Sequence, residues 1–182
     1  MKKVLGPDFF DRPTLLVARD LLGKFLVRKV GNKTIALMIT ETEAYDGFKD
    51  KASHAHRGQT LRNAPMFGEP GRIYVYFTYG MHWMLNLVCG KKEYPAAVLV
   101  RGAGEIVGPA RLTKALGVDK SLTALPLSKK SGLWIEDRGV VVRPRDISRT
   151  PRIGINYAGE YVHKPWRFVI KKGSKVGAIL KS

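Results

Sequence analysis

The sequence predicts one domain of the α+β class, with a mixed, largely antiparallel β-sheet core and a few surrounding helices. The first observation is the length, because 182 residues suit a single domain, to which we assign residues 1–182. The second is that stretches rich in Val, Ile, Leu and Tyr outnumber stretches that suit helices. The third is that these stretches do not alternate regularly with helices, as they would in a parallel sheet.

The N-terminal part is expected to hold one helix and two strands. The helix is placed at Thr14–Leu22, because Pro13 precedes it and Gly23 follows it, which is the usual punctuation of a helix. The two strands are placed at Lys24–Val30 and Thr34–Tyr45. The short glycine-containing connection between them favours a tight turn.

A long polar segment follows, from Lys49 to Gly71. It carries glycine and proline residues at intervals and shows neither helical nor strand periodicity. A loop of this length inside one domain is usually functional. We therefore expect an ordered loop that lies over a binding site.

The remaining elements are expected to complete the sheet. Further strands are placed at Arg72–Thr78, Met81–Cys89 and Ala96–Arg101. A short helix over Pro109–Leu116 is closed by Gly117, since glycine suits the end of a helix. The last expected elements are a hairpin of Leu133–Glu136 and Val140–Arg143 around Asp137-Arg138-Gly139, and a strand at Arg167–Lys171.

The charge balance indicates a polyanionic partner. The chain has 32 Lys and Arg against 15 Asp and Glu, a formal charge of +17, and the excess extends from Lys2 to Lys181. Nucleic acid is the first candidate partner and an acidic membrane surface the second, while a basic face kept for solubility is the plain alternative. No helix combines a basic face with a strong apolar face, so no membrane partner is expected.

The same sequence excludes several other classes. Cys89 is the sole cysteine, so no intramolecular disulfide forms, and no signal peptide or apolar run long enough to cross a bilayer is present. The chain is expected to be soluble and intracellular. His54 and His56 have no second spaced pair of ligands, so zinc is not expected. A G-x-S-x-G elbow and a Walker or Rossmann glycine pattern are absent.

Two strand segments carry the candidate chemistry. In regular alternation Glu41, Glu43 and Tyr45 share one face, which is a poor core pattern and a good reactive surface. Taken alone, this segment favours the plainer interpretation, an exposed strand with two solvated carboxylates. Tyr74, Tyr76 and Thr78 likewise share a face, with Phe77 turned towards the core. Tyr79 stands beside Gly80 at a break, where an aromatic side chain can project and enter a base step.

The polar loop adds further candidates. His54 is interpreted as a hydrogen-bonding or stacking residue. Arg57, Arg62 and Asn63 could contact phosphates or could be ordinary solvated side chains. Residue type alone leaves both interpretations open.

Short motifs occur in order along nearly the whole chain. They are Phe9-Phe10-Asp11-Arg12-Pro13, Ala18-Arg19-Asp20-Leu21-Leu22-Gly23, Glu41-Thr42-Glu43-Ala44-Tyr45, Pro70-Gly71, Tyr74-Val75-Tyr76, Tyr79-Gly80-Met81, Gly108-Pro109, Ala158-Gly159-Glu160 and Lys164-Pro165-Trp166-Arg167-Phe168. In their order and spacing they resemble the alkyladenine (3-methyladenine) DNA glycosylase family. The segment Gly90–Pro95 departs from the family pattern, which leaves the register between Asn86 and Arg101 open.

The resemblance implies a role for each matching residue. Glu43 corresponds to the catalytic acid residue that activates water, and Arg101 to an arginine that helps to hold this water; Glu41 is an alternative base. The residues that would bind the flipped purine are Tyr45, His54, Tyr76 and Asn86, the last of which would screen purines. Tyr79 corresponds to the wedge that enters the DNA, with Met81 beside it. A backbone carbonyl on the water would fall at about Ile153.

The resemblance also implies the reaction. A single DNA glycosylase domain would flip alkylated or deaminated purines (3-methyladenine, 7-methylguanine or hypoxanthine) out of duplex DNA and hydrolyse the N-glycosidic bond. No lysine falls within the matched catalytic segments, so a monofunctional enzyme that leaves an abasic site is expected. It would need no cofactor or metal, act as a monomer, and work in the cytoplasm or nucleoid, or in the nucleus of a eukaryote. The alternative is a non-catalytic nucleic-acid-binding module resembling a formyltransferase tail domain.

Overall fold

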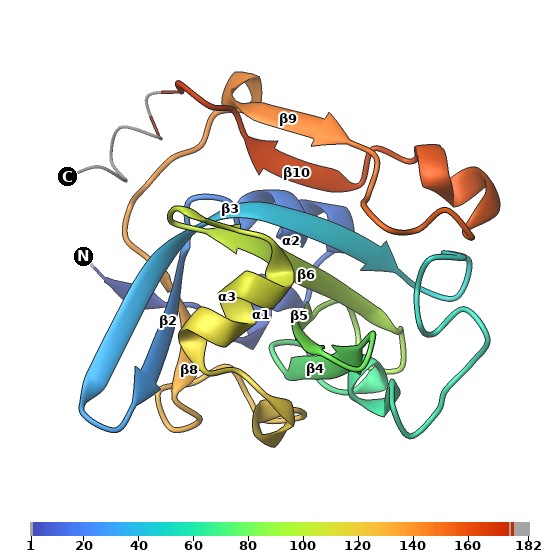
Figure 1. The fold of residues 1–182 in the computed structure, drawn as a ribbon, viewed down its shortest axis with the longest axis horizontal. Coiled ribbons are helices and arrows are strands. Elements are labelled where there is room, and N and C mark those ends of the chain that lie inside the picture. The colour runs from blue at the N-terminus through green and yellow to red at the C-terminus, as the bar shows by residue number, and fades with distance from the viewer. Residues whose placement is uncertain (1, 175, 177–182) are drawn as a thin grey trace.

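A ten-stranded antiparallel sheet forms the centre of the molecule (Figure 1). The computed structural model describes residues 2–174 and 176. The strands are β1 (Lys3–Val4), β2 (Phe25–Val30), β3 (Lys33–Asp46), β4 (Ile73–Thr78), β5 (His82–Val88), β6 (Ala96–Ala103), β7 (Ile106–Val107), β8 (Leu133–Asp137), β9 (Ile147–Thr150) and β10 (Arg167–Ile170). The α-helices are α1 (Pro7–Phe10), α2 (Thr14–Asp20) and α3 (Pro109–Leu116). The expected α+β class is confirmed.

Strand β3 connects the parts of the sheet. The main strand order is β1-β8-β2-β3-β6-β5-β4, and β10 pairs with both β3 and β9. One edge of β3 pairs with β6, while the other edge pairs first with β2 and then, from Glu41 to Glu43, with β10. The register with β6 shifts on both sides of Glu41, and such a bulge re-aims the side chains beside it. Thus β3 changes partner where its two glutamates lie.

The core fixes which face of β3 is turned to the helices. Thr42 and Ala44 are fully buried, and the Thr42 hydroxyl donates a hydrogen bond to the carbonyl of Ala18 in α2 at 2.8 Å. Because side chains alternate along a strand, Glu43 and Tyr45 point away from α2. In Figure 1, α2 lies behind β3 while α3 lies in front of the sheet, where it contacts β5 and β6.

Most expected elements are confirmed, with ends shifted by one or two residues. The helix at Pro109–Leu116 is found as expected, and Gly117 adopts the left-handed conformation at its end (φ 57°). Helix α2 is shorter than expected and ends at Asp20. The short elements β1, α1, β7 and β9 were not predicted, because each has too few residues for a periodic pattern to be visible.

The hairpin expected around Asp137-Arg138-Gly139 is wrong. Strand β8 pairs with β1 on one edge and with β2 on the other, so no edge remains for Val140–Arg143. Those residues form no strand. Instead Val140 and Val142 are half-buried against the core, close to the backbone of Gly23. Tertiary competition for the edges of β8 overrides the local turn signal.

The long segment between β3 and β4 is an ordered loop, as expected. Its only regular element is a 3-10 helix at Ala64–Phe67. Asn63 is 1% exposed, and its Nδ2 donates to the carbonyls of His54 at 2.8 Å and Gly58 at 3.0 Å, while its Oδ1 accepts from the amide of Thr60. Asn63 therefore holds the loop together and is not free to contact a phosphate.

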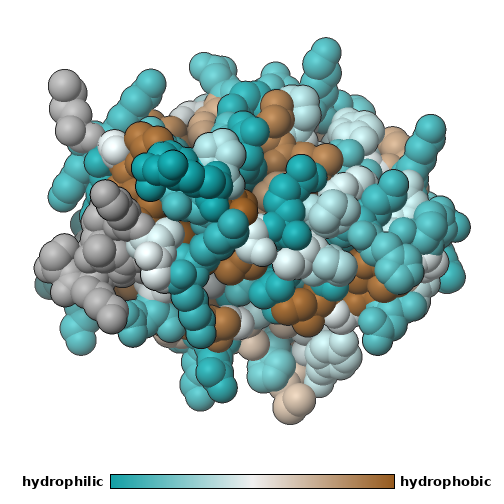
Figure 2. All heavy atoms as spheres, turned by 90° about the horizontal axis from the view of Figure 1, so that it is seen from above, coloured by the Kyte–Doolittle hydropathy of each residue, from teal (hydrophilic) through white to brown (hydrophobic). Residues whose placement is uncertain are grey.

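The surface is predominantly polar. Hydrophilic side chains cover most of the face seen in Figure 2, with small hydrophobic patches between them. In the part of the chain that the structure describes, every helix is too short or too polar to cross a lipid bilayer.

Candidate active site

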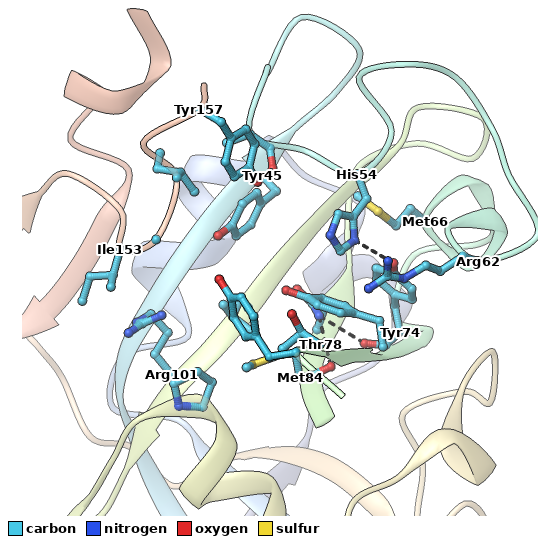
Figure 3. A pocket seen from close by; sticks show the side chains of 18 residues that line it. Tyr45, His54, Arg62, Met66, Tyr74, Thr78, Met84, Arg101, Ile153 and Tyr157 are labelled. Carbon is cyan, nitrogen blue, oxygen red and sulfur yellow. Dashed lines mark hydrogen bonds between the residues drawn. The ribbon is translucent and has the colours of Figure 1, made fainter. Parts of the chain in front are cut away.

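A cavity of about 440 Å³ opens where the C-terminal part of β3 meets β4, β5 and β6 (Figure 3). The long loop closes one side with His54 and Arg62, and the segment after β9 closes another with Ile153 and Tyr157. Six residues expected at the site line this cavity, namely Tyr45, His54, Tyr76, Tyr79, Asn86 and Arg101. The fold thus brings together side chains that are up to 56 positions apart in the sequence (from Tyr45 to Arg101).

Glu43 lies beneath this cavity with a fully buried side chain. The Tyr45 hydroxyl donates to its Oε2 at 3.0 Å, and the backbone amide of Ile153 donates to its Oε1 at 2.8 Å. The Nε of Arg101 lies 3.4 Å from the same Oε1. The side chain of Glu43 is 0% exposed and that of Glu41 is 6% exposed, so the alternative of two solvated carboxylates is wrong.

Burial controls the protonation of Glu43. Removal of the carboxylate from water raises its pKa above the usual 4.5, and the charge of Arg101 and the Ile153 and Tyr45 hydrogen bonds offset this only in part. A carboxylate with a raised pKa is a stronger base than an ordinary glutamate. The donors nevertheless stabilise the ionised form, so the site favours a buried but reactive carboxylate.

The carboxylate of Glu41 accepts hydrogen bonds from two arginines. Its Oε1 accepts from the Nε of Arg101 at 2.8 Å and from the Nε of Arg167 at 2.6 Å. Neither Glu41 nor Glu43 is among the residues that line the cavity, but the lining residues Tyr45, Ile153 and Arg101 all contact Glu43. Because both contacts of Glu41 are to arginines, they suit the orientation of Arg101 beside Glu43 better than proton transfer. The bulge in β3 lies at Glu41.

Aromatic rings of His54, Tyr74 and Tyr76 form one wall of the cavity. The ring centroids of His54 and Tyr76 are 4.4 Å apart with an edge-on orientation, and those of Tyr74 and Tyr76 are 5.5 Å apart. His54 Nδ1 lies 3.0 Å from the Tyr74 hydroxyl. Burial, together with the charge of Arg62, lowers the pKa of His54 to about 4, and burial raises the pKa of Tyr76 to about 12. At neutral pH this wall is therefore uncharged.

Tyr74, Arg62 and Tyr157 line the cavity but were not predicted to contact the base. Tyr74 is 1% exposed and holds His54; its place beside Tyr76 on the same strand face was the available signal. Arg62, which the sequence offered as a phosphate contact, is an exposed residue that donates to the carbonyl of Phe77 at 2.8 Å, with its guanidinium 5.3 Å from the Tyr76 ring centroid. Tyr157 comes from the segment after β9, where the resemblance implied only a backbone carbonyl at about Ile153.

The turn between β4 and β5 projects from the rim of the cavity. Tyr79 has a positive φ of 51°, which is uncommon for a bulky residue, and is 80% exposed. Met81 is 68% exposed and does not line the cavity. The core position expected for Phe77 is wrong: it is 42% exposed and stacks on Trp83 at 4.5 Å, because this end of β4 extends past the core.

Strands β5 and β6 are antiparallel neighbours that carry Asn86 and Arg101. Asn86 on β5 pairs with Leu99 on β6, and Arg101 lies two residues further along β6. Asn86 is 3% exposed, and its Nδ2 donates to the carbonyls of Tyr74 and Met84 at 3.3 Å each. The amide is therefore bonded to backbone groups and also lines the cavity.

The two histidines of the loop have separate environments. His56 Nδ1 lies 2.9 Å from the carbonyl of Phe48, away from His54. Among residues 2–174 and 176, no group of three or more His, Cys, Asp and Glu side chains is arranged to hold a metal ion. Arg57 is exposed on the same loop.

Comparison with known proteins identifies similar chains over nearly the whole length. The model of the family "Methylpurine-DNA glycosylase (MPG)" matches residues 8–107 and 104–174. A protein of Methanocella arvoryzae is 46% identical over 189 residues, which cover 92% of each chain. One of Streptomyces avermitilis is 45% identical over 188 residues, covering 91% of this chain and 87% of the relative. Both relatives bear the name "Putative 3-methyladenine DNA glycosylase".

The raised pKa of Glu43 predicts a pH-dependent effect of Glu43→Gln on stability. The native state holds the Glu43 proton more tightly than the unfolded state, so the wild-type free energy of unfolding should fall, relative to the variant, as pH rises above 4.5. Thermal melts of both proteins across a pH series would measure this. Melting curves that keep a constant separation at all pH values would contradict a raised pKa.

Proposed function

This chain belongs to the methylpurine-DNA glycosylase family, and we propose that it flips a damaged purine into the cavity. A water molecule activated by Glu43 would then hydrolyse the N-glycosidic bond between this purine and its deoxyribose. The protein is a DNA-3-methyladenine glycosylase, a hydrolase of N-glycosyl bonds that acts on alkylated purines in base excision repair. One observation carries the mechanism: a fully buried carboxylate is contacted by Tyr45, Arg101 and Ile153, which line a cavity walled by aromatic rings.

The cavity suits a flipped purine in size and in charge. Its volume of about 440 Å³ is within the range of small-molecule sites. Tyr45 and Tyr76 offer ring faces or edges to a planar base, and alkylated purines are cationic or electron-poor, so aromatic faces attract them. His54, with its lowered pKa, stays neutral and does not repel such a base. Stacking thereby favours damaged over normal purines.

Glu43 and Arg101 would carry the chemistry. Cleavage of the N-glycosidic bond passes through an oxocarbenium-like state, which a nearby carboxylate stabilises while it takes a proton from water. Each carboxylate oxygen can accept two hydrogen bonds, and Oε2 accepts only that of Tyr45, so it retains room for a water once the Tyr45 ring shifts. Arg101, held by Glu41, would orient that water.

The backbone of Ile153 would act on Glu43 as well. The sequence resemblance placed a carbonyl near this residue on the water. The contact in this fold is the Ile153 amide, which donates to Glu43 Oε1 and so stabilises the carboxylate form. Because the amide occupies Oε1, the oxygen that could also bind the water is Oε2, which accepts from the Tyr45 hydroxyl.

The basic surface and the exposed turn would engage duplex DNA. A charge of +17 favours binding to phosphates, with a strong dependence on salt. Tyr79 and Met81 stand exposed at the cavity rim, where apolar and aromatic side chains can fill the gap left by a flipped base. Among residues 2–174 and 176 no lysine lines the cavity, which supports a monofunctional reaction that leaves an abasic site. A non-catalytic binding module would have no use for the buried Glu43.

Replacement of the proposed base should separate binding from cleavage. Glu43→Gln keeps the shape of the side chain but cannot take a proton, so base release should fall by roughly 10²- to 10⁴-fold while lesion-DNA affinity is retained. The assay is single-turnover release from DNA with one hypoxanthine, followed by hot alkali. Glu105→Gln, at an exposed glutamate between β6 and β7, is the control and should cleave normally. Near-normal release by Glu43→Gln would remove Glu43 from the mechanism.

Removal of the proposed wedge should impair base flipping. In Tyr79→Ala nothing fills the gap in the duplex, so a fluorescent base analogue at the lesion should brighten less on binding. Val141→Ala is a matched control, because Val141 is 75% exposed and does not line the cavity. Unchanged fluorescence together with unchanged cleavage would rule out a role for Tyr79 in the DNA.

The amide of Asn86 should screen purines by exclusion. Asn86→Ser would open space where the 2-amino group of guanine projects, so the release of normal guanine relative to hypoxanthine should rise. The variant also loses two hydrogen bonds to backbone carbonyls, a cost of about 1–3 kcal/mol in stability. The ratio of the two single-turnover rates measures the effect, and an unchanged ratio in folded protein would assign Asn86 to structure.

A further inference from the structure

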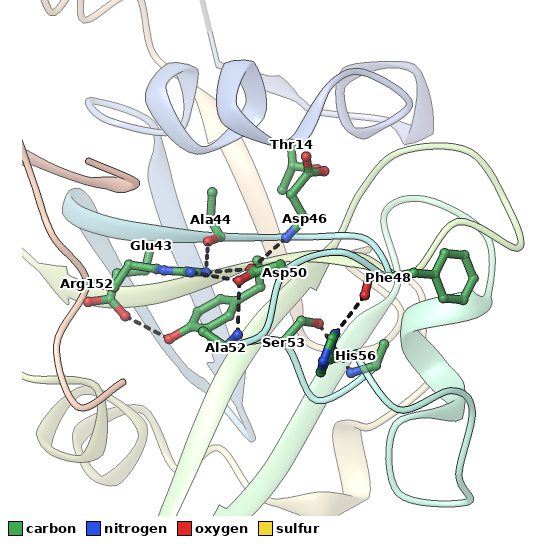
Figure 4. A network of polar contacts seen from close by, with 12 residues as sticks. Thr14, Glu43, Ala44, Asp46, Phe48, Asp50, Ala52, Ser53, His56 and Arg152 are labelled. Carbon is green, nitrogen blue, oxygen red and sulfur yellow. Dashed lines mark hydrogen bonds and ion pairs between the residues drawn. The ribbon is translucent and has the colours of Figure 1, made fainter. Parts of the chain in front are cut away.

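We propose that the buried ion pair of Asp50 and Arg152 is a positioning device for the glycosylase reaction. It contacts the backbone of Ala44, next to Glu43 on β3, and joins the loop that carries His54 to the segment that carries Ile153 (Figure 4). Neither residue lines the cavity, and neither matched the motifs found in the sequence. The inference rests on the proposed role of Glu43 as the base, and it concerns how that base is held.

The pair is bidentate and fully enclosed. Arg152 Nη1 lies 2.6 Å from Asp50 Oδ2, Arg152 Nη2 lies 2.8 Å from Asp50 Oδ1, and both side chains are 0% exposed. The Nη1 also donates to the carbonyl of Ala44 at 2.8 Å, between Glu43 and Tyr45 on β3. A two-point contact fixes orientation as well as distance. Three segments that are remote in sequence thus meet at one guanidinium.

Asp50 shapes the loop on its side of the pair. Its Oδ2 accepts from the amide of Asp46 and its Oδ1 from the amide of Ala52, each at 3.1 Å, and its carbonyl accepts from the amide of Ser53 at 2.8 Å. These bonds define the turn that leads from the end of β3 to His54. Movement of Asp50 would therefore move the histidine that faces Tyr74 and Tyr76.

Arg152 acts on the catalytic carboxylate through its neighbours. Its guanidinium carbon lies 4.7 Å from the centroid of the Tyr45 ring and 5.1 Å from that of Trp166. The next residue, Ile153, donates its amide to Glu43 Oε1 at 2.8 Å, and the Tyr45 hydroxyl donates to Oε2. The guanidinium thus supports two of the donors to Glu43. It packs on the ring of Tyr45, and its own residue is bonded through the backbone to Ile153.

Stability alone does not account for such a pair. A buried ion pair pays a desolvation cost that its attraction barely offsets, and apolar residues of similar volume often stabilise a fold as well. Within the described residues the Nε of Arg152 has no hydrogen-bond partner, a further cost. What the pair supplies, and apolar packing would not, is a defined geometry between the two loops and β3.

Variants that remove both charges test the proposal with least harm to folding. In Asp50→Asn/Arg152→Met no unpaired charge stays buried, and single-turnover base release should fall about 10- to 100-fold, because small displacements of reacting groups have effects of this size. The affinity for lesion DNA should change little. Arg152→Lys keeps the charge but not the two-point contact, and should fall between the double variant and wild type.

A pH profile distinguishes positioning from a general structural role. The titratable and charged groups that face Glu43 are Glu41 and Tyr45 on β3, Tyr76 on β4, Arg101 on β6 and the Ile153 amide from the segment after β9. The Ile153 hydrogen bond lowers the Glu43 pKa, so its loosening should move the acid limb of the rate profile to higher pH. Partial unfolding would reduce the amplitude without moving the limb.

The control is a partly exposed ion pair whose residues do not line the cavity. Asp137→Asn breaks the contact at 2.7 Å between Asp137 in β8 and Lys24, the residue before β2, and should leave the rate and the acid limb unchanged. All rates are measured below the melting temperature of each variant. If the double variant does not fold, Arg152→Lys carries the same measurements.

Two outcomes separate this proposal from the one on which it rests. Normal release by Glu43→Gln would overturn the function proposed for Glu43. An inactive Glu43→Gln, combined with a wild-type rate and a wild-type acid limb in the folded double variant or in Arg152→Lys, would overturn the positioning role alone. A slower rate with a shifted limb, and an unchanged control, would support it.

Discussion

The burial of the Glu43 carboxylate is the constraint on which the rest of the site depends. A carboxylate with no exposure is costly unless donors surround it. Here the donors come from β3 itself through Tyr45, from β6 through Arg101, and from the segment after β9 through Ile153. Three parts of the chain must therefore meet to supply donors to the Glu43 carboxylate. Where they meet, they form one side of the cavity.

The geometry of β3 makes this convergence possible. One edge of the strand pairs with β6 throughout its second half, while the other passes from β2 to β10. The alternation of a strand buries Thr42 and Ala44 against the helices and turns Glu43 and Tyr45 to the opposite side. The bulge at Glu41 lets a second carboxylate bind Arg101 and Arg167, so that neighbouring acids take different tasks.

The surface of the molecule and the aromatic wall of its cavity differ in charge. The surface carries a large positive excess that suits a phosphate backbone, whereas the aromatic wall of the cavity is neutral because burial shifts the pKa values of His54 and Tyr76 away from neutrality. In the function proposed here, a cationic base would be drawn to the protein as part of a polyanion and would then meet an uncharged aromatic wall, with Arg62 and Arg101 elsewhere in the cavity lining.

The sequence by itself determined the class of fold, most strands, the helix at Pro109–Leu116 and the family, because periodicity, glycine positions and motif order are local properties of the chain. Alternation along the strands also indicated Tyr45, Tyr76 and the pair Glu41 and Glu43, and the resemblance to the family singled out Glu43. It could not decide that Val140–Arg143 is displaced from the sheet, that Phe77 is exposed, or that Asp50 and Arg152 pair. Each of these depends on which remote segment occupies a strand edge or a buried space, and that competition is settled only when the whole chain packs.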